Sequence, residues 1–211
     1  MASVVAIDIS QGSWKVDMAC GSRRRARHAG SAPPRRPGRV LVSRAQIARR
    51  IPVLARQIAR RYAGQELTVV AVMTGSLMFL SDLLRRLDLP VRLSLVRVSS
   101  YPGTVTRARR PQVGPLANDL AGRHVLVVDD VLDRGGTLRV LLERIRRRRP
   151  ASLHSCVLLC KNLSAQPDDR VAPEFVGFEV PDRFVVGYGL DYDNLYRNLP
   201  DVRELQLESR G

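Results

Sequence analysis

The sequence predicts an α/β fold in which a parallel, twisted sheet is flanked by helices. Short apolar runs of strand length alternate along the chain with amphipathic stretches of helical periodicity. The run at 125–128 is apolar at every position, and the run at 67–73 is apolar except at Thr68, which is typical of strands buried on both faces of a parallel sheet. With 211 residues, 45% of them apolar, the chain is long enough to bury the core of one globular domain.

The first predicted element is a helix that starts after Ser43. Ser43 and Gln46 have the spacing of a capping box, in which each residue satisfies a backbone N–H of the other. Pro52 lies inside the helical pattern, and because proline removes a helical hydrogen bond we expect a kink or two separate helices. Gly64 ends the pattern. The apolar positions at helical spacing are Ile47, Ile51, Leu54, Ile58 and Tyr62.

Strands and helices alternate in the rest of the chain. Residues 99–119 combine Pro, Gly, Thr and Arg with few apolar side chains, which predicts a long mobile loop. The predicted helices cover residues 77–87 and 137–149. The predicted strands cover residues 67–73, 91–98, 125–128, 153–160 and 184–186.

The predicted globular domain spans residues 40–211, and residues 1–39 lie outside it. Residues 19–39 are rich in Gly, Ser, Pro and Arg and contain almost no apolar side chains, a composition that favours disorder. Two origins fit residues 1–39: a disordered extension, or a translation start assigned too far upstream.

The chain carries a formal net charge of +15, from 35 Lys and Arg against 20 Asp and Glu. Its only lysines are Lys15 and Lys161, so the charge reflects a general use of Arg and does not predict specific nucleic-acid binding. No apolar run approaches the roughly 20 residues of a membrane span, and the three cysteines have no disulfide or zinc spacing. We expect a cytoplasmic protein without a membrane partner.

The most informative segment follows the strand at 125–128. This strand leads directly into Asp129 and Asp130, then Asp133, then a Gly135-Gly136-Thr137 turn that opens a helix. In parallel sheets ligands bind beyond the carboxyl ends of strands, and a glycine turn at a helix N-terminus suits a phosphate. Carboxylates there suit sugar hydroxyls, or a divalent cation that bridges other phosphates. The segment therefore predicts a sugar-phosphate site, and it is neither a Walker loop nor a GxGxxG motif.

Lys161 is a second candidate for ligand binding. It is the one lysine of the predicted domain, and it directly follows the strand at 153–160. A compact ammonium at the carboxyl end of a strand suits a single carbonyl acceptor in a tight pocket, where Arg is no substitute.

Around these residues the sequence resembles the type I phosphoribosyltransferases, and among them most closely the hypoxanthine-guanine phosphoribosyltransferases. The similarity is collinear over about residues 40–205. It implies that family's fold, with a small hood built from the chain ends. It also implies an enzyme of purine salvage that transfers phosphoribose from phosphoribosyl pyrophosphate to N9 of hypoxanthine or guanine, giving IMP or GMP plus pyrophosphate. Besides the aspartate segment, the similar segments are 40–43, 77–85, 88–91, 99–101, 122–126, 175–182 and 184–192.

The resemblance also implies roles for individual residues. Asp133 would be the catalytic general base toward the purine N7, and Lys161 would donate to O6 of a 6-oxopurine. The residues implied to bind phosphoribosyl pyrophosphate are Asp129, Asp130, Asp133, Arg134, Gly135, Gly136, Thr137, Thr74, Gly75, Ser100, Tyr101 and Arg197. Those implied to bind the purine are Lys161, Phe184, Val185 and Asp191, and those implied to ligate Mg²⁺ are Asp129, Asp130 and Asp191.

Two positions depart from the family's pattern. Thr74 stands where the family commonly has a lysine, and Arg134 stands where it usually has a threonine. Neither change removes a catalytic group. The family norm implies a homodimer or homotetramer.

Two alternatives to the implied function stay open. One is a transferase of the same fold that prefers xanthine or another base. The other is a nucleotide-responsive regulator or nucleic-acid binder that kept the fold. The carboxylate set together with Lys161 favours catalysis, because a binder has no need of Asp133.

Overall fold

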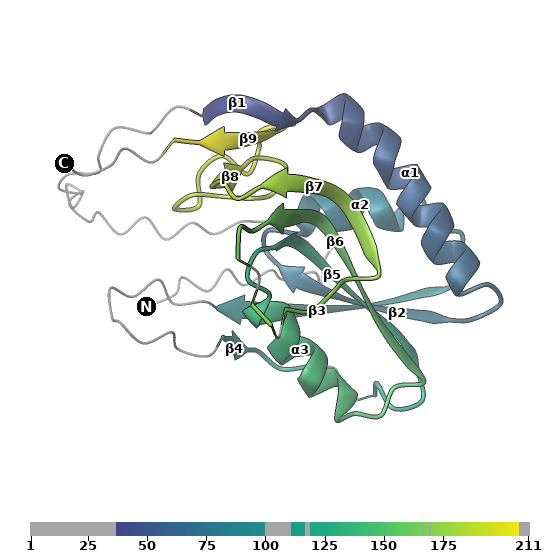
Figure 1. Cartoon of the computed structure of the whole chain (residues 1–211). Helices are drawn as coiled ribbons and strands as arrows, with labels where there is room; N and C mark the ends of the chain where they lie inside the picture. Colours follow the sequence, from purple (N-terminus) through teal and green to yellow (C-terminus); the bar gives the residue numbers. More distant parts are fainter. Residues whose placement is uncertain (1–36, 100–110, 117–118, 166, 169, 207–211) are drawn as a thin grey trace, which may run out of the picture. The chain divides into compact units, whose positions relative to one another are not determined.

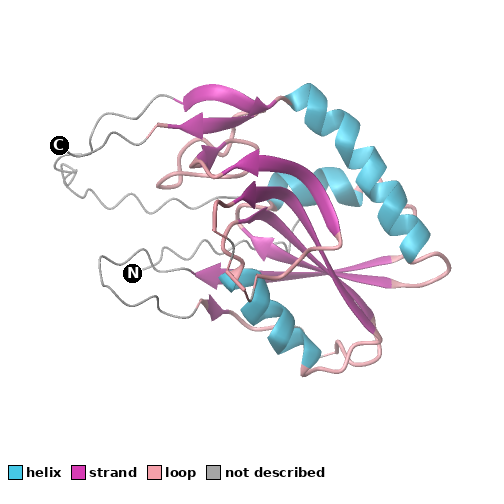
Figure 2. Ribbon diagram, viewed as in Figure 1, coloured by secondary structure: helices cyan, strands magenta, loops and turns pink. Residues whose placement is uncertain are grey.

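The computed structural model describes residues 37–99, 111–116, 119–165, 167–168 and 170–206. Ser100 and Tyr101, two residues implied to bind substrate, lie outside the described residues. Figures 1 and 2 show the arrangement of the helices and strands. In chain order these are β1 (Pro37–Val42), α1 (Arg44–Arg61), β2 (Leu67–Met73), α2 (Leu77–Leu84), β3 (Val91–Ser99), β4 (Gln112–Val113), β5 (His124–Leu132), α3 (Gly136–Arg146), β6 (Ser152–Asn162), β7 (Phe175–Pro181), β8 (Val185–Val186) and β9 (Val202–Leu205).

The main sheet has six strands in the order β4-β3-β2-β5-β6-β7. All neighbouring strands from β3 to β7 are parallel, and the short β4 is antiparallel to β3. After β2 the chain adds β3 on one side, and it then returns to place β5 on the other side of β2. The strand order therefore reverses between β2 and β5, and such a switch point is where open parallel sheets bind ligands.

Side chains of the central strands point alternately into two hydrophobic cores. Along β2, Val69 and Ala71 belong to one core, whereas Val70 and Val72 belong to the other. The first core contains the buried faces of α1 and α2, and the second contains that of α3. Figure 1 accordingly shows α1 and α2 on one side of the sheet and α3 on the other. This arrangement confirms the predicted fold class.

A second, three-stranded sheet joins the two ends of the described chain in the antiparallel order β1-β9-β8. It is the small hood that the resemblance implied. β1 begins at Pro37, before the predicted domain boundary at residue 40, because Pro37 to Val42 find partners on β9. Residues 1–36 lie outside the described part of the chain.

The first helix confirms one expectation and corrects another. Ser43 and Gln46 form the predicted capping box. Of the two outcomes expected at Pro52, two separate helices are excluded, because α1 is one helix with Pro52 inside it. Buried Ile51 and Leu54 flank the proline, so packing against the sheet stabilises the helix where proline weakens it.

Other differences concern short or half-buried strands. The predicted loop at 99–119 contains β4 and the buried Leu116. β5 is longer than predicted and includes Asp129 and Asp130, whereas the predicted strand at 184–186 is the two-residue β8. The strands β1, β7 and β9 were not predicted, because none of them is a continuous apolar run. No helix in the described ranges is long and apolar enough to cross a membrane.

Candidate active site

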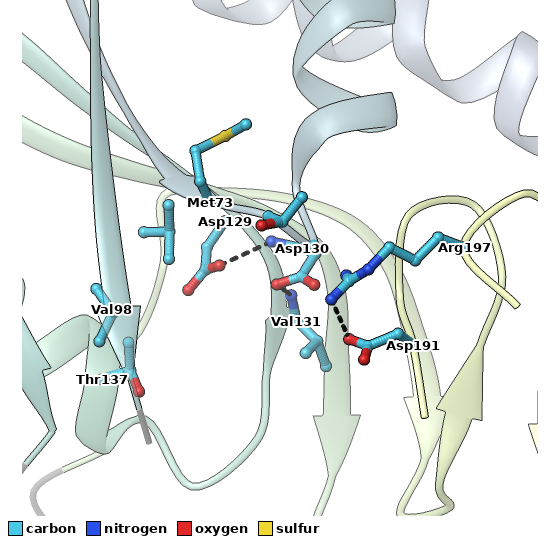
Figure 3. Close-up of a pocket in the computed structure, with 11 residues that line it drawn as sticks. Met73, Val98, Asp129, Asp130, Val131, Thr137, Asp191 and Arg197 are labelled. Atoms are coloured by element: carbon cyan, nitrogen blue, oxygen red, sulfur yellow. Dashed lines mark hydrogen bonds and ion pairs between the residues drawn. The ribbon is translucent and has the colours of Figure 1, made fainter. Parts of the chain in front are cut away.

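A cavity of about 360 Å³ lies at the switch point of the main sheet. β2 and β5 pair from Leu67–His124 to Ala71–Val128, and the residues that follow on both strands line the cavity. Figure 3 shows Asp129 and Asp130 in its middle, with Thr137 on one side and Arg197 and Asp191 on the other. The lining residues are Val72, Met73, Thr74, Gly75, Val98, Asp129, Asp130, Val131, Thr137, Asp191 and Arg197.

Asp129 and Asp130 form a carboxylate pair in the cavity. Asp129 is 5% exposed, and its Oδ1 accepts a hydrogen bond from the Asp130 amide at 3.0 Å. The Oδ1 of Asp130 accepts from the Val131 amide at 3.0 Å. Burial, with added repulsion from the Asp130 carboxylate, holds the pKa of Asp129 well above its usual range, and burial also raises the pKa of Asp130. The pair is therefore suited to binding a cation or hydroxyl donors.

Two glycines allow the loops around Asp130 to approach closely. A Cβ on Gly75 would lie 1.7 Å from Asp130 Oδ2, so no side chain fits at position 75 beside this carboxylate. Gly189 has φ +99°, and a Cβ there would lie 2.2 Å from the Gly75 carbonyl oxygen. The loop after β2 and the loop after β8 are thus in direct backbone contact at the cavity. The peptide bond between Met73 and Thr74 is cis.

Arg197 and Asp191 are held to each other at the edge of the cavity. Arg197 Nη2 lies 2.7 Å from Asp191 Oδ1, and its Nη1 donates to the Gly189 carbonyl at 2.7 Å. Asp191 Oδ2 accepts from the Asn194 amide at 2.8 Å. The loop's own hydrogen bonds therefore fix a guanidinium that faces the cavity.

The Gly135-Gly136-Thr137 turn begins α3 as the sequence predicted. Gly135 precedes the helix with φ +82°, a backbone conformation that a side chain disfavours. Thr137 lines the cavity from the first turn of α3, where unpaired N–H groups and the helix dipole suit an anion. Arg134 is exposed beside this turn.

Asp133 and Lys161 form a polar cluster at the carboxyl ends of β5 and β6. Lys161 is 9% exposed, and its Nζ lies 2.9 Å from Asp133 Oδ2 and 3.6 Å from Asp182 Oδ1. The Asp133 side chain is half exposed. Neither Asp133 nor Lys161 is among the residues that line the cavity, so the pair forms a separate group at the carboxyl ends of β5 and β6.

The two remaining purine residues lie on the hood. Phe184 is 38% exposed, and its ring makes a T-shaped contact with Tyr192 with 5.6 Å between the ring centres. Val185 is buried at the start of β8. Neither of them lines the cavity. The predicted site residues thus fall into a cavity group, the Asp133–Lys161 pair and an aromatic pair on the hood.

Two contacts that hold the site together could not be predicted from the sequence. Tyr188 donates its hydroxyl to Asp82 Oδ2 at 2.6 Å, which ties the loop after β8 to α2. Arg170 donates to the backbone carbonyls of Asp133 and Lys161. Arg170 is one of many arginines and follows a polar segment without periodicity, so nothing in the sequence marks it.

The donor set fits Mg²⁺ only if a substrate supplies further ligands. Within the described ranges, no three metal-ligating side chains lie close enough together to hold an ion by themselves. Asp191, implied as a ligand, already uses both carboxylate oxygens within its loop. Mg²⁺ is commonly bound through one or two carboxylates plus phosphate oxygens, and the buried Asp129–Asp130 pair meets that pattern.

Comparison with known proteins assigns the chain to a family. Residues 41–193 match the model of the phosphoribosyl transferase domain. The chain belongs to the phosphoribosyltransferase family. The family that the sequence resemblance implied is thereby confirmed. The protein is an enzyme of the transferase class.

Individual phosphoribosyltransferases are similar over most of the chain. The hypoxanthine phosphoribosyltransferase of Salmonella typhimurium is 40% identical over 171 residues, which cover 80% of this chain and 95% of that protein. The hypoxanthine-guanine phosphoribosyltransferase of Mycobacterium avium is 41% identical over 176 residues, 79% of this chain and 84% of that protein. A crystal structure of a hypoxanthine-guanine phosphoribosyltransferase from Bacillus anthracis has a TM-score of 0.75 and 32% identity, and the match covers 81% of this chain and 100% of that one. These relatives favour the transferase over a regulator or nucleic-acid binder.

Proposed function

We propose that the protein transfers phosphoribose from phosphoribosyl pyrophosphate to N9 of hypoxanthine or guanine, giving IMP or GMP plus pyrophosphate. One observation carries the proposal. The carboxylate pair, the phosphate turn and the Asp133–Lys161 pair all lie in or directly after the carboxyl-terminal parts of two adjacent parallel strands, β5 and β6. The names of the similar proteins support the same reaction.

The cavity group binds the sugar phosphate. Backbone N–H groups of the turn from Asp133 to Thr137 hold the 5′-phosphate, and the exposed Arg134 adds a positive charge. Asp129 and Asp130 accept hydrogen bonds from the ribose hydroxyls. The backbone at Thr74 and Gly75, together with Arg197, contacts the pyrophosphate.

The carboxylates of Asp129 and Asp130, with Asp191 nearby, would hold Mg²⁺ together with substrate oxygens. When bound, Mg²⁺ neutralises the negative charge that grows on the departing pyrophosphate. Arg197 also neutralises this negative charge, because its guanidinium is fixed at the cavity edge before substrate arrives.

Asp133 and Lys161 match one edge of a 6-oxopurine. A donor and an acceptor lie 2.9 Å apart in the pair, and the purine presents an acceptor, O6, next to a donor, N7–H. Lys161 donates to O6, and Asp133 takes the N7 proton as the bond from N9 to the sugar C1′ forms and the bond from C1′ to pyrophosphate breaks. Adenine has an amino group in place of O6. A hydrogen-bond donor of the base would then face the Lys161 ammonium, which is also a donor.

Phe184 stacks on the purine ring, and the Val185 and Asp191 backbone contacts the opposite edge. The partial exposure of Phe184 supports this role, since its T-shaped contact with Tyr192 leaves part of the side chain uncovered. Stacking of a base on an aromatic ring is worth about 1–3 kcal/mol.

The test is nucleotide formation with Mg²⁺, phosphoribosyl pyrophosphate and each of hypoxanthine, guanine, xanthine and adenine. We expect IMP and GMP as products. Xanthine belongs in the panel because it shares O6 and N7 with the other two bases. A lack of product with every base would contradict the proposal, and a preference for xanthine would establish the alternative transferase.

The oligomeric state of the protein and its location in the cell are predictions. A homodimer or homotetramer in the cytoplasm is expected from the family alone. Sedimentation of the purified protein measures the first, and fractionation of cells measures the second.

A further inference from the structure

Arg170 places its guanidinium against the carboxyl ends of β5 and β6. Its Nε donates to the Asp133 carbonyl at 2.9 Å, and its Nη2 donates to the Lys161 carbonyl at 2.8 Å and the Leu132 carbonyl at 3.2 Å. The same Nη2 lies 3.6 Å from Cys160 Sγ. One side chain therefore binds the backbone of both strand ends.

These contacts connect the two residues assigned to the purine edge. The side chains of Asp133 and Lys161 meet at 2.9 Å, and their backbone carbonyls share the Arg170 guanidinium as a donor. Arg170 is not among the residues that line the cavity. Its influence on the reaction therefore passes through Asp133 and Lys161.

The stem of Arg170 also packs against the phosphate turn. A Cβ on Gly135 would lie 3.3 Å from Arg170 Cγ. The side chain thus touches the turn that opens α3 as well as the two strand ends.

A guanidinium suits this position better than any other cation. It is planar, is charged at every accessible pH and presents five N–H donors in a fixed geometry. A lysine ammonium is a compact point charge on a flexible stem, so it does not hold carbonyls of two strands in one fixed arrangement. The strength of the contact therefore depends on shape as well as charge.

We propose that Arg170 is a positioning residue for the transfer reaction. By binding the backbone carbonyls of Asp133 and Lys161, it fixes the spacing of the acceptor and the donor that face N7 and O6 of the purine. This inference rests on the proposed function, in which those two side chains contact the base. Loss of Arg170 should slow the proton transfer, with a smaller effect on the binding of phosphoribosyl pyrophosphate in the cavity.

The experiment compares R170A, R170K and R50A with the unsubstituted protein, assayed with hypoxanthine, phosphoribosyl pyrophosphate and Mg²⁺. Arg50 is a matched control, because its guanidinium donates to the Gly177 and Val176 carbonyls at 2.9 and 2.7 Å and does not line the cavity. We expect kcat of R170A to fall on the order of 10²-fold, as for a small misplacement of catalytic groups, with a smaller change in KM for phosphoribosyl pyrophosphate. R50A should keep its kcat and lose thermal stability.

The conservative variant and chemical rescue separate positioning from simple destabilisation. R170K keeps the charge but not the planar fork, so its kcat should fall nearly as far as that of R170A. Millimolar guanidinium chloride should restore part of the activity of R170A and have no effect on R50A. Sodium chloride at the same concentration is the control for ionic strength.

Full kcat in R170K would overturn the inference and leave the proposed function intact. An equal loss of kcat in R50A would also overturn it, because the effect would then be general. If R170A does not fold, R170K decides the question. An unsubstituted protein that forms no nucleotide from any 6-oxopurine would contradict the proposed function itself, and the role of Arg170 would fall with it.

Discussion

Among single residues, Lys161 carries the proposed choice of base. Its ammonium is buried and lies between the carboxylates of Asp133 and Asp182, at 2.9 and 3.6 Å. A buried ammonium has three donors and no acceptor, so it suits the oxygen of a 6-oxopurine and opposes the amino group of adenine.

Replacing Lys161 with glutamine is expected to weaken this choice. A side-chain amide can donate to O6 of hypoxanthine or accept from the amino group of adenine. A site built around one such contact discriminates by roughly 10⁴-fold, so K161Q should lower the hypoxanthine-to-adenine ratio of kcat/KM by about 10²-fold or more. The measurement is kcat/KM for both bases.

The matched control for K161Q is D182N. Asp182 contacts the same ammonium at a longer distance and is half exposed, so D182N should keep the ratio. An unchanged ratio in K161Q would contradict the role of Lys161.

The buried carboxyl of Asp129 serves ligand binding but is expected to lower the stability of the folded protein. Burial and the neighbouring Asp130 raise the pKa of Asp129, so placing a negative charge on this carboxyl is unfavourable in the folded protein without Mg²⁺. The unfolded chain has the ordinary carboxyl pKa of about 3.9, so stability is lost as the pH rises from there through the raised pKa of the folded state. D129N lacks this charge, and its amide oxygen can still accept from the Asp130 amide.

In EDTA at neutral pH, D129N is therefore expected to unfold at a higher temperature than the unsubstituted protein. Each kcal/mol gained corresponds to about 2–4 °C in a domain of this size, and the difference should vanish as the pH falls toward about 4. Thermal unfolding across this pH range is the measurement. A lower unfolding temperature for D129N at neutral pH would show that burial of this charge carries no cost.

The sequence predicted most of the residues that form the cavity, because they belong to local motifs. The carboxylate pair and Thr137 follow from a strand, a turn and a helix that are adjacent in the chain. The contact of Gly75 with Asp130 and the Arg170 hydrogen bonds join segments far apart in the chain. Such contacts depend on tertiary packing. No local pattern in the sequence marks the residues that make them, so they could not be predicted.

Secondary-structure elements were predictable where burial was uniform. β2 and the core of β5 and β6 are continuous apolar runs and were recognised, as were the apolar faces of α1 and α3. β4 has two residues, which is too few for a periodic signal, whereas the equally short β8 was predicted because it lies in the apolar run at 184–186. Strands at the sheet edge and in the hood expose part of their side chains, so their apolar residues are interrupted.

The loop after β8 depends on one hydrogen bond to α2. The Tyr188 hydroxyl donates to Asp82 at 2.6 Å, and the Tyr188 amide donates to the Leu199 carbonyl at 2.7 Å. Burial, with the adjacent Asp82 carboxylate, raises the pKa of Tyr188, so the hydroxyl remains a donor at neutral pH. This contact holds Gly189 against Gly75 and Arg197 at the cavity edge.

Y188F is therefore expected to loosen the pyrophosphate side of the cavity. Loss of a hydrogen bond to a charged group destabilises by about 1.5–3 kcal/mol, and KM for phosphoribosyl pyrophosphate should rise more than kcat falls. The control is Y62F, since the Tyr62 hydroxyl lies 2.7 Å from His154 Nδ1 and does not line the cavity. Y62F should lower stability and leave KM unchanged; an equal KM in Y188F and the unsubstituted protein would contradict the anchoring role.

Across the whole molecule, the net charge of +15 serves internal contacts as well as ligands. Several guanidiniums donate to backbone carbonyls within the described fold: those of Arg50, Arg144, Arg170 and Arg197. The charge excess is therefore a poor indicator of a nucleic-acid partner.

Binding to nucleic acid is accordingly expected to be weak and non-specific. Its affinity should fall on the order of 10³-fold between about 50 and 200 mM salt, as counterion release predicts for contacts to phosphates alone. Titration of labelled DNA and RNA of several sequences over a salt series measures this. Nanomolar binding that keeps a sequence preference at high salt would support the regulator instead.

The most direct test of the proposed reaction is a competition between bases in one vessel. The unsubstituted protein, Mg²⁺ and phosphoribosyl pyrophosphate are mixed with hypoxanthine and adenine at equal concentration, and the nucleotides are identified by mass. The Asp133–Lys161 pair predicts IMP in excess over AMP by roughly 10⁴-fold. AMP as the main product, or no nucleotide at all, would contradict the account.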